Sequence, residues 1–291
     1  MKKIEFATEV KAIIEERYPD KEAKLNEVTK NNDMIFTQIS IRGKDERVAP
    51  SIAIEYGEDP IAEADRICKV YEEAQKNSQD MNFDLDFVQD WERVKNCITP
   101  RIINKDMNKE FLKGLPFRDF EDLAIYYVID CQLFKNPRGD VSSIRVSDEM
   151  LKIWEKTEKE LFEQSVDNIN TETQVEDILD VLEAMGYEIP DEARKEQAMI
   201  VITNKKNIYG AASILVPEVC EKLSERLGGN FYVFPSSIHE LIAVPAGIDA
   251  DVTYLKDMVS GINQTEVSPD IFLSDNVYIF DAESKMLKIA G

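Results

Sequence analysis

Residues 230–245 read NFYVFPSSIHELIAVP, and this stretch decides how the last third of the chain is expected to fold. It holds two apolar runs, at 231–234 and 240–244, on either side of a turn that contains a proline and two serines. Short apolar runs bounded by turn residues predict β-strands. The stretch also contains His239, the one histidine among the 291 residues, so it is the first place to look for chemistry.

Strand and helix signals alternate on both sides of this stretch. The expected strands lie at 199–203, 208–216, 231–234, 240–244, 271–273, 277–280 and 286–289, with helices at 217–227 and 252–262 between them. Gly228 and Gly229 are expected to end the first of these helices, because glycine readily adopts the positive φ of a helix end. This order predicts an antiparallel sheet that is covered on one face by two helices.

The first 146 residues show a similar mixture of signals. Helices are expected at 5–17, 60–76 and 83–94, and strands at 34–41, 52–56, 97–103, 117–120, 123–129 and 141–146. The run LAIYYVI at 123–129 is apolar on both faces, and such a run is typical of a strand inside a sheet. We therefore expect it to be a central strand.

Residues 147–196 differ from the rest in charge. They contain 16 acidic and 5 basic residues, a net charge of −11 within a chain whose net charge is −22. Helical periodicity at 147–166 and 173–185 predicts a hairpin of two helices with the acidic residues on solvated faces. Two other interpretations of the charge remain open: a protein that imitates DNA, or an acidic docking surface for a basic partner.

The chain is thus predicted to be an α+β protein with mostly antiparallel sheets and helices packed on one face. Two subdomains are expected, an N-terminal α+β domain at 1–146 and a C-terminal α+β domain at 197–291. The acidic helical hairpin at 147–196 is expected to connect them.

Composition argues against several classes of function. Direct nucleic-acid binding needs clustered Lys and Arg, which a chain with a pI near 4.5 does not offer. No apolar run is long enough to span a bilayer, and the first 20 residues lack the apolar core of a signal peptide, so we expect a cytoplasmic protein without membrane contact. The four cysteines are far apart in the sequence, and we expect them to be reduced thiols.

The turn at 235–240 supplies the candidate site residues. Ser236 or Ser237 could act as a nucleophile with His239 as base and Glu240 as the group that orients the imidazole. Neighbours on a strand point to opposite faces, however, and the surroundings are not the G-x-S-x-G elbow of common hydrolases. A structural role in the turn is therefore expected, while a polar binding site and covalent catalysis remain alternatives.

We expect neither a metal nor a cofactor. His239 and Glu240 lack the second histidine of an H-E-x-x-H zinc motif. Gly228 and Gly229 follow a helix and precede a strand, the reverse of the order that presents backbone amides to a phosphate.

Three segments resemble a known family as a set: YGAA at 209–212, PSSIHE at 235–240 and LSDNVY at 273–278. They are similar to the C-terminal part of an uncharacterised family of domain-of-unknown-function proteins from Firmicutes, especially clostridia, and the similarity extends more weakly over the whole chain. The resemblance implies a bacterial intracellular protein and assigns no activity, cofactor or site residue.

The sequence as a whole favours a non-enzymatic cytosolic binding or regulatory protein that acts through a protein partner. The alternative from another class is a serine/histidine-dependent hydrolase or transferase. An acidic DNA-mimic protein is the third hypothesis.

Overall fold

The run LAIYYVI forms strand β6 (Leu123–Ile129), every residue of which is buried. Its β-branched and aromatic residues suit a pleated surface that is packed on both sides. Antiparallel partners lie on either side, β4 (Ile98–Asn104) and β5 (Phe117–Phe120), and β7 (Ile144–Arg145) pairs with its end. The prediction of a central strand at 123–129 is confirmed.

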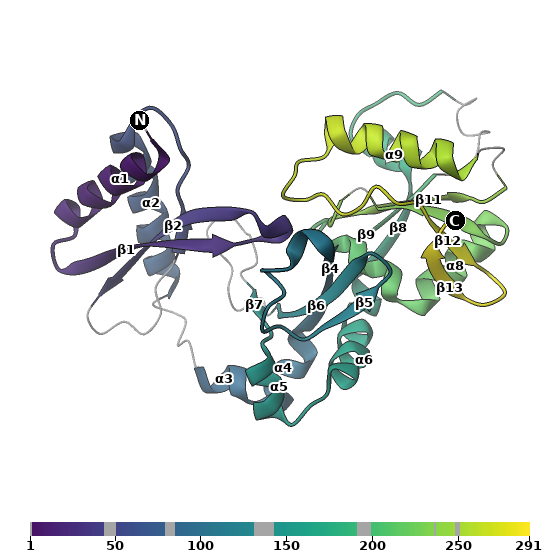
Figure 1. The fold of residues 1–291 in the computed structure, drawn as a ribbon, viewed down its shortest axis with the longest axis horizontal. Coiled ribbons are helices and arrows are strands. Elements are labelled where there is room, and N and C mark those ends of the chain that lie inside the picture. The colour runs from purple at the N-terminus through teal and green to yellow at the C-terminus, as the bar shows by residue number, and fades with distance from the viewer. Residues whose placement is uncertain are drawn as a thin grey trace.

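The computed structural model describes residues 2–43, 51–78, 85–130, 143–190, 199–235, 237–247 and 251–291. Its first part is a hairpin with two helices on one side (Figure 1). The elements are α1 (Lys3–Arg17), β1 (Lys21–Thr29), β2 (Ile35–Gly43), β3 (Ser51–Ala53) and α2 (Pro60–Ser78). Val10 and Ile14 of α1 pack with Ile67 of α2 and Ile39 of β2 in a core of their own.

The C-terminal part contains an antiparallel sheet with the strand order β13-β12-β10-β11-β9-β8. Its strands are β8 (Thr173–Asp177), β9 (Ile200–Asn204), β10 (Phe231–Phe234), β11 (Leu241–Pro245), β12 (Tyr278–Asp281) and β13 (Met286–Ile289). The opening stretch supplies β10 and β11, which pair with each other. The predicted α+β class with antiparallel sheets is confirmed.

The two helices of this part lie on opposite faces of the sheet (Figure 1). Phe231 and Val233 of β10 point toward α8 (Pro217–Leu227), within one core cluster. Tyr232 and Phe234 point the other way, toward α9 (Val252–Glu266). Alternate residues of a strand face opposite sides, and both sides of β10 are apolar. The expectation of two helices on a single face is therefore wrong for this sheet.

Residues 147–185 do not form the predicted hairpin of two helices. Ser147 caps α5 (Asp148–Trp154), Glu155 then adopts a positive φ of 54°, and Thr157 caps α6 (Glu158–Ile169). After the short 3-10 turn η5 (Asn170–Glu172), the chain forms β8 and only then the short helix α7 (Ile178–Ala184). The segment TQVED pairs with β9 as an antiparallel strand. This pairing overrides the helical propensity of the segment.

The segment 208–216 was expected to be a strand but forms the 3-10 helix η7 (Gly210–Leu215). Both edges of β9 are already occupied, by β8 and β11, so no edge remains for another strand. The segment 271–273 is likewise not a strand, and only Phe272 forms an isolated bridge, to Ser237.

The remaining described helices are short segments between strands of one sheet or on the path from α2 to β4. They are the 3-10 turns η1 (Asn31–Asp33), η2 (Lys95–Cys97) and η3 (Asp106–Asn108), and the short helices α3 (Leu85–Gln89) and α4 (Trp91–Val94). One core cluster contains residues from α3 to β12, including Val128, Leu161 and Ile202. This cluster crosses the predicted domain boundaries at 146 and 196, so those positions do not separate independent cores.

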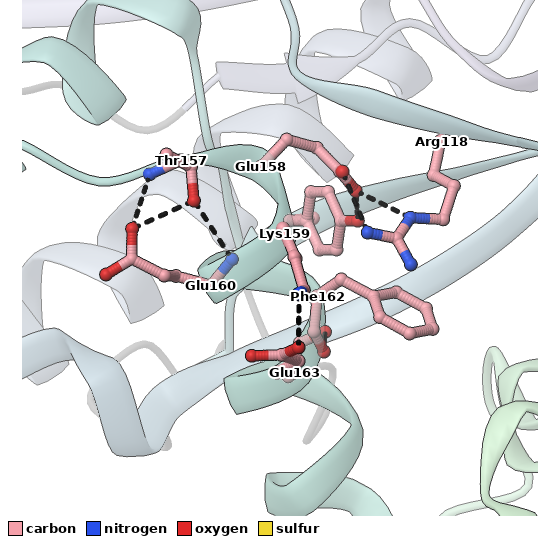
Figure 2. Close-up of polar contacts among 9 residues, drawn as sticks. Arg118, Thr157, Glu158, Lys159, Glu160, Phe162 and Glu163 are labelled. Carbon is pink, nitrogen blue, oxygen red and sulfur yellow. Dashed lines mark hydrogen bonds and ion pairs between the residues drawn. The ribbon is translucent and has the colours of Figure 1, made fainter.

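A partly buried carboxylate, that of Glu158, fixes α6 to the sheet around β6, as Figure 2 shows. Glu158 accepts two hydrogen bonds from the Arg118 guanidinium, at 3.1 and 3.0 Å, and a third from the Tyr127 hydroxyl. Burial, and secondarily the bond to Glu158, raises the pKa of Tyr127. The Arg118 guanidinium also lies 3.9 Å from the centre of the Phe162 ring. Every charged group in this cluster is paired, which indicates a structural role.

A second carboxylate connects the turn between β5 and β6 to the C-terminal part. Asp122 accepts hydrogen bonds from the Ser274 hydroxyl (2.6 Å), the Asn276 amide (3.0 Å) and the Tyr278 hydroxyl. Burial, with the bond to Asp122 as the second cause, raises the pKa of Tyr278. The LSDNVY segment thus serves to hold this turn.

Four asparagine side chains, which we call the asparagine clasp, donate to backbone carbonyls at 269–274. They are Asn31 and Asn32 of η1, Asn104 of β4 and Asn263 of α9, with donor–acceptor distances of 2.7 to 3.1 Å. The clasp joins the tip of the N-terminal hairpin, the central sheet and the C-terminal part at one place.

Asp33 reinforces the same contact from the hairpin tip. Its carboxylate accepts hydrogen bonds from the backbone N–H groups of Glu110 (3.0 Å) and Phe111 (2.8 Å). Its φ of 50° is one that Asp tolerates better than most residues.

The cysteines differ from expectation at one position. Cys68 and Cys220 are free, and burial raises the pKa of the Cys220 thiol to about 12. Cys97 is disulfide-bonded, so the prediction of reduced thiols is wrong there. Cys131 lies outside the described residues.

Within the described ranges, no helix has both the length and the apolar character required to cross a membrane.

Replacing Asp33 by Asn should loosen the hairpin tip. One of the two backbone N–H groups loses a charged acceptor, which we expect to cost about 1–3 kcal/mol of local stability. Hydrogen exchange of the Glu110 and Phe111 amides measures the effect and should become faster. Asn26→Ala is the control, because Asn26 bonds only within the hairpin, to Lys24 and Ser40. Equal exchange in both variants would contradict the assigned role of Asp33.

Candidate functional site

The three segments that resemble a family meet in space. Backbone hydrogen bonds connect them directly or through the neighbouring residue: Ala211 N–H to Ile238 O (3.3 Å), Ile238 N–H to Ile271 O (2.9 Å) and Ser274 N–H to Pro235 O (3.0 Å). The turn at 235–240 is therefore enclosed by η7 on one side and by the loop at 269–274 on the other.

Ser237 serves the turn itself. Its side chain is buried, and its hydroxyl oxygen accepts hydrogen bonds from the backbone N–H groups of His239 (3.1 Å) and Glu240 (3.3 Å). Serine hydroxyls commonly satisfy backbone groups in this way. The other predicted nucleophile, Ser236, lies outside the described residues.

His239 is half-buried and also bonded to the backbone. Its Nδ1 accepts a hydrogen bond from the Tyr209 N–H (3.1 Å), so the neutral ring carries its proton on Nε2. A general base needs a free ring nitrogen, and this tautomer offers none. Burial is the largest cause that lowers the pKa of His239, and Arg101 adds to it, while Glu240 and Asp270 act in the opposite direction.

The structure thus brings Ser237 and His239 together through the backbone, not through their side chains. No hydrogen bond joins the Ser237 hydroxyl to the imidazole in the described part of the chain. Glu240 is exposed. Among the described residues, the arrangement stabilises a turn and does not place the Ser237 hydroxyl against the imidazole.

Gly210 is required by close packing next to this turn. A Cβ atom at this position would lie 2.3 Å from Thr203 Oγ1, 2.6 Å from Asn204 N and 2.6 Å from His239 O. Two of these three atoms are backbone, which cannot rotate away. The preceding residue, Tyr209, has a positive φ of 56°, so the chain turns sharply here.

Tyr209 connects the turn to a polar cleft. Its ring centre is 5.6 Å from that of His239, and the Arg101 guanidinium lies 3.7 Å from the Tyr209 ring centre. Beyond Arg101 is a cavity of about 70 Å³ between β4, the end of α6 and the loop from β9 to η7. Arg101 is only 8% exposed, which is rare for a charged residue.

Sequence reasoning missed this cleft. Arg101 interrupts the apolar run of the strand at 97–103, and Asp130 follows the last residue of LAIYYVI. A charge inside an apolar strand is the signal that points to a buried polar site. It is a weak signal, because the sequence does not show which of the two strand faces is covered.

No group of three or more metal-ligating side chains is present among the residues that the structure describes.

Gly210→Ala should destabilise the protein. The added methyl group collides with backbone atoms, and overpacking of this kind costs about 1–3 kcal/mol. Chemical denaturation measures the free energy of unfolding. Gly57→Ala is the matched control, because nothing lies within 4 Å of a Cβ there. A neutral Gly210→Ala would show that the junction is looser than the distances imply.

The pKa of His239 should lie below that of an unfolded histidine, which is about 6.5. The unfolded state then binds the proton more readily, so this residue's contribution to stability is present above about pH 6.5 and decreases as the pH falls below it. NMR titration of the single imidazole measures the pKa directly in native and urea-unfolded protein. His239→Gln should remove this part of the pH dependence of unfolding, and a native pKa above the unfolded one would refute the prediction.

The sequence of this chain matches one protein-family model. The model of the family of unknown function DUF5688 matches residues 3–282. Neither the curated proteins nor the solved structures contain a match. The expected resemblance to an uncharacterised family is confirmed, and this chain belongs to the family of unknown function DUF5688.

Proposed function

We propose that this chain is a non-enzymatic binding or regulatory protein that acts through a protein partner. The observation that carries the proposal is a partly exposed apolar helix beside a strand edge that no described strand covers. We call the area formed by β8, α7, Met185 and Tyr187 the β8–α7 surface.

The strand β8 is at the edge of its sheet. It pairs with β9 on one side, and no strand within the described ranges pairs with its other side. An open strand edge presents unpaired N–H and C=O groups, to which an extended segment of another protein can add.

The helix α7 continues directly from this edge. Its apolar residues Ile178, Leu179, Val181 and Leu182 are all partly exposed, and the helix has no fully buried residue. Beyond it, Met185 is 71% and Tyr187 is 63% exposed. An amphipathic helix normally buries its apolar side, so this one presents area for a partner.

Charge indicates the kind of partner. Residues 172–188 contain six acidic residues and no basic one. Glu176 of β8 is exposed, as are Glu172 and Glu188 on either side. Complementarity therefore favours an extended segment that is rich in Lys and Arg and carries apolar residues for α7.

The other two hypotheses gain less support. A serine/histidine hydrolase requires a basic imidazole, but Nδ1 of His239 already accepts a backbone hydrogen bond. A DNA mimic was expected to carry its charges on a regular hairpin of two helices, but β8 interrupts that segment.

The proposal includes an origin in Firmicutes and a cytoplasmic location. The resemblance of the YGAA, PSSIHE and LSDNVY segments supports the origin. The disulfide at Cys97 weighs against the location, since such bonds are rare in reducing compartments.

A photo-crosslinking amino acid at position 187 should capture the partner. Position 254 is the matched control, because Tyr254 is 64% exposed but lies on α9. We expect a protein crosslinked from position 187 and not from 254, with the attached peptide rich in Lys and Arg when identified by mass spectrometry. Capture should weaken as salt is increased, because screening reduces the attraction between exposed charges.

A charge reversal tests the same surface. Glu176→Lys should weaken capture, whereas Glu218→Lys on α8, another exposed acidic position, should not. Equal crosslinking from 187 and 254, or capture of acidic peptides only, would contradict the proposal.

A further inference from the structure

The cleft next to Tyr209 has the size of a small metabolite. Its volume is about 70 Å³. A water molecule needs about 10–15 Å³ by this measure, so the cleft admits a ligand of about five to seven non-hydrogen atoms. Its walls come from β4, α6, η5 and the loop between β9 and η7.

Most polar groups of the walls are already bonded. The Asn168 amide donates to Lys95 O (2.6 Å) and Ile98 O (2.8 Å). The Asn204 amide donates to Ile208 O, and the Ser213 hydroxyl donates to Thr203 O. Two of the four charged wall residues are in ion pairs, Glu172 with Lys205 (3.8 Å) and Lys206 with one oxygen of Asp130 (3.7 Å). The groups that remain for a ligand are Arg101 and the other oxygen of Asp130.

Arg101 lacks a carboxylate partner among the described residues: its guanidinium lies against the face of Tyr209 and interacts with the Tyr126 hydroxyl. This is unexpected in a chain with 57 acidic residues and 35 basic ones. A buried guanidinium is costly unless it is paired. Its planar fork fits a carboxylate with two parallel hydrogen bonds. An anion from outside the chain would satisfy it.

Asp130 has the opposite requirement. Its side chain is 15% exposed, and the Lys206 ammonium is 3.7 Å from Oδ2, too far for a hydrogen bond. The other oxygen, Oδ1, is buried without any hydrogen-bond partner. Buried carboxylate oxygens normally accept hydrogen bonds, so a cationic donor in the cleft would complete this group.

We propose that this cleft binds a small α-amino acid, with its carboxylate on Arg101 and its ammonium on Asp130. A zwitterion of about six non-hydrogen atoms matches the Arg101 guanidinium, the unpaired Oδ1 of Asp130 and the volume. Pro100, Ile169, Ile208 and Ala212 form the apolar part of the wall and favour a short side chain. This site goes beyond the proposed function. It adds a small-molecule ligand to a protein that is proposed to bind a protein partner.

Isothermal titration calorimetry with glycine, L-alanine, L-phenylalanine, acetate and methylamine tests the site on the full chain. We expect glycine and alanine to bind, with phenylalanine excluded by size and each half-ligand at least tenfold weaker. Arg101→Lys and Asp130→Asn should each weaken binding of alanine about tenfold or more, because each removes a charge-assisted hydrogen bond. The controls Arg42→Lys and Asp65→Asn alter exposed ion pairs in the N-terminal part and should leave binding unchanged.

Folding of the Arg101 variant is a separate concern, because that side chain is buried. Ile208→Trp avoids it: Ile208 is exposed but lines the cleft, so the larger ring should block binding without altering the core. Absence of heat with glycine and alanine at millimolar concentration would overturn the proposal. So would acetate binding that equals alanine binding and is unaffected by Asp130→Asn.

Discussion

The structure is organised around one irregular loop, residues 269–274, whose backbone carbonyls need hydrogen-bond donors. Each carbonyl from 269 to 274 accepts a hydrogen bond, although none of these residues is in a helix or a regular strand. The donors are the four side chains of the asparagine clasp and the Ile238 N–H. A buried backbone without such partners would be strongly unfavourable. Because the donors come from three parts of the chain, satisfying this loop also fixes how those parts meet.

The sequence predicted the elements whose pattern is local. LAIYYVI is apolar on both faces and is the buried centre of its sheet, and the runs around PSSIHE form β10 and β11. The wrong predictions of secondary structure share one cause, which is tertiary packing. TQVED becomes strand β8 because it pairs with an open edge of β9. GAASIL becomes a 3-10 helix because β9, paired with β8 and β11, has no edge left for another strand. Neither fact can be read from the segments themselves.

The candidate site shows the same division. The lone histidine lies near the cleft, since Tyr209 contacts both His239 and Arg101. The charged groups of the cleft come from Arg101, Asp130, Glu172 and Lys206, which are separated in sequence and have no common motif. Their proximity follows from the pairing of β4 with β6 and from the turn at Gly210. Periodicity identifies strands, but it does not identify which strand ends will be neighbours.

The separate core of the first 71 residues has a consequence for cooperativity. Its apolar residues pack with one another and form a cluster distinct from the one around β6. The strongest recorded links between these two bodies are the polar contacts of Asn31, Asn32 and Asp33. Among the described residues, the unfolding of one core is therefore coupled to that of the other mainly through the contacts of these three residues. Within the described residues, the two bodies thus meet at one small polar contact, and loss of its hydrogen bonds would let them move apart while both cores stay folded.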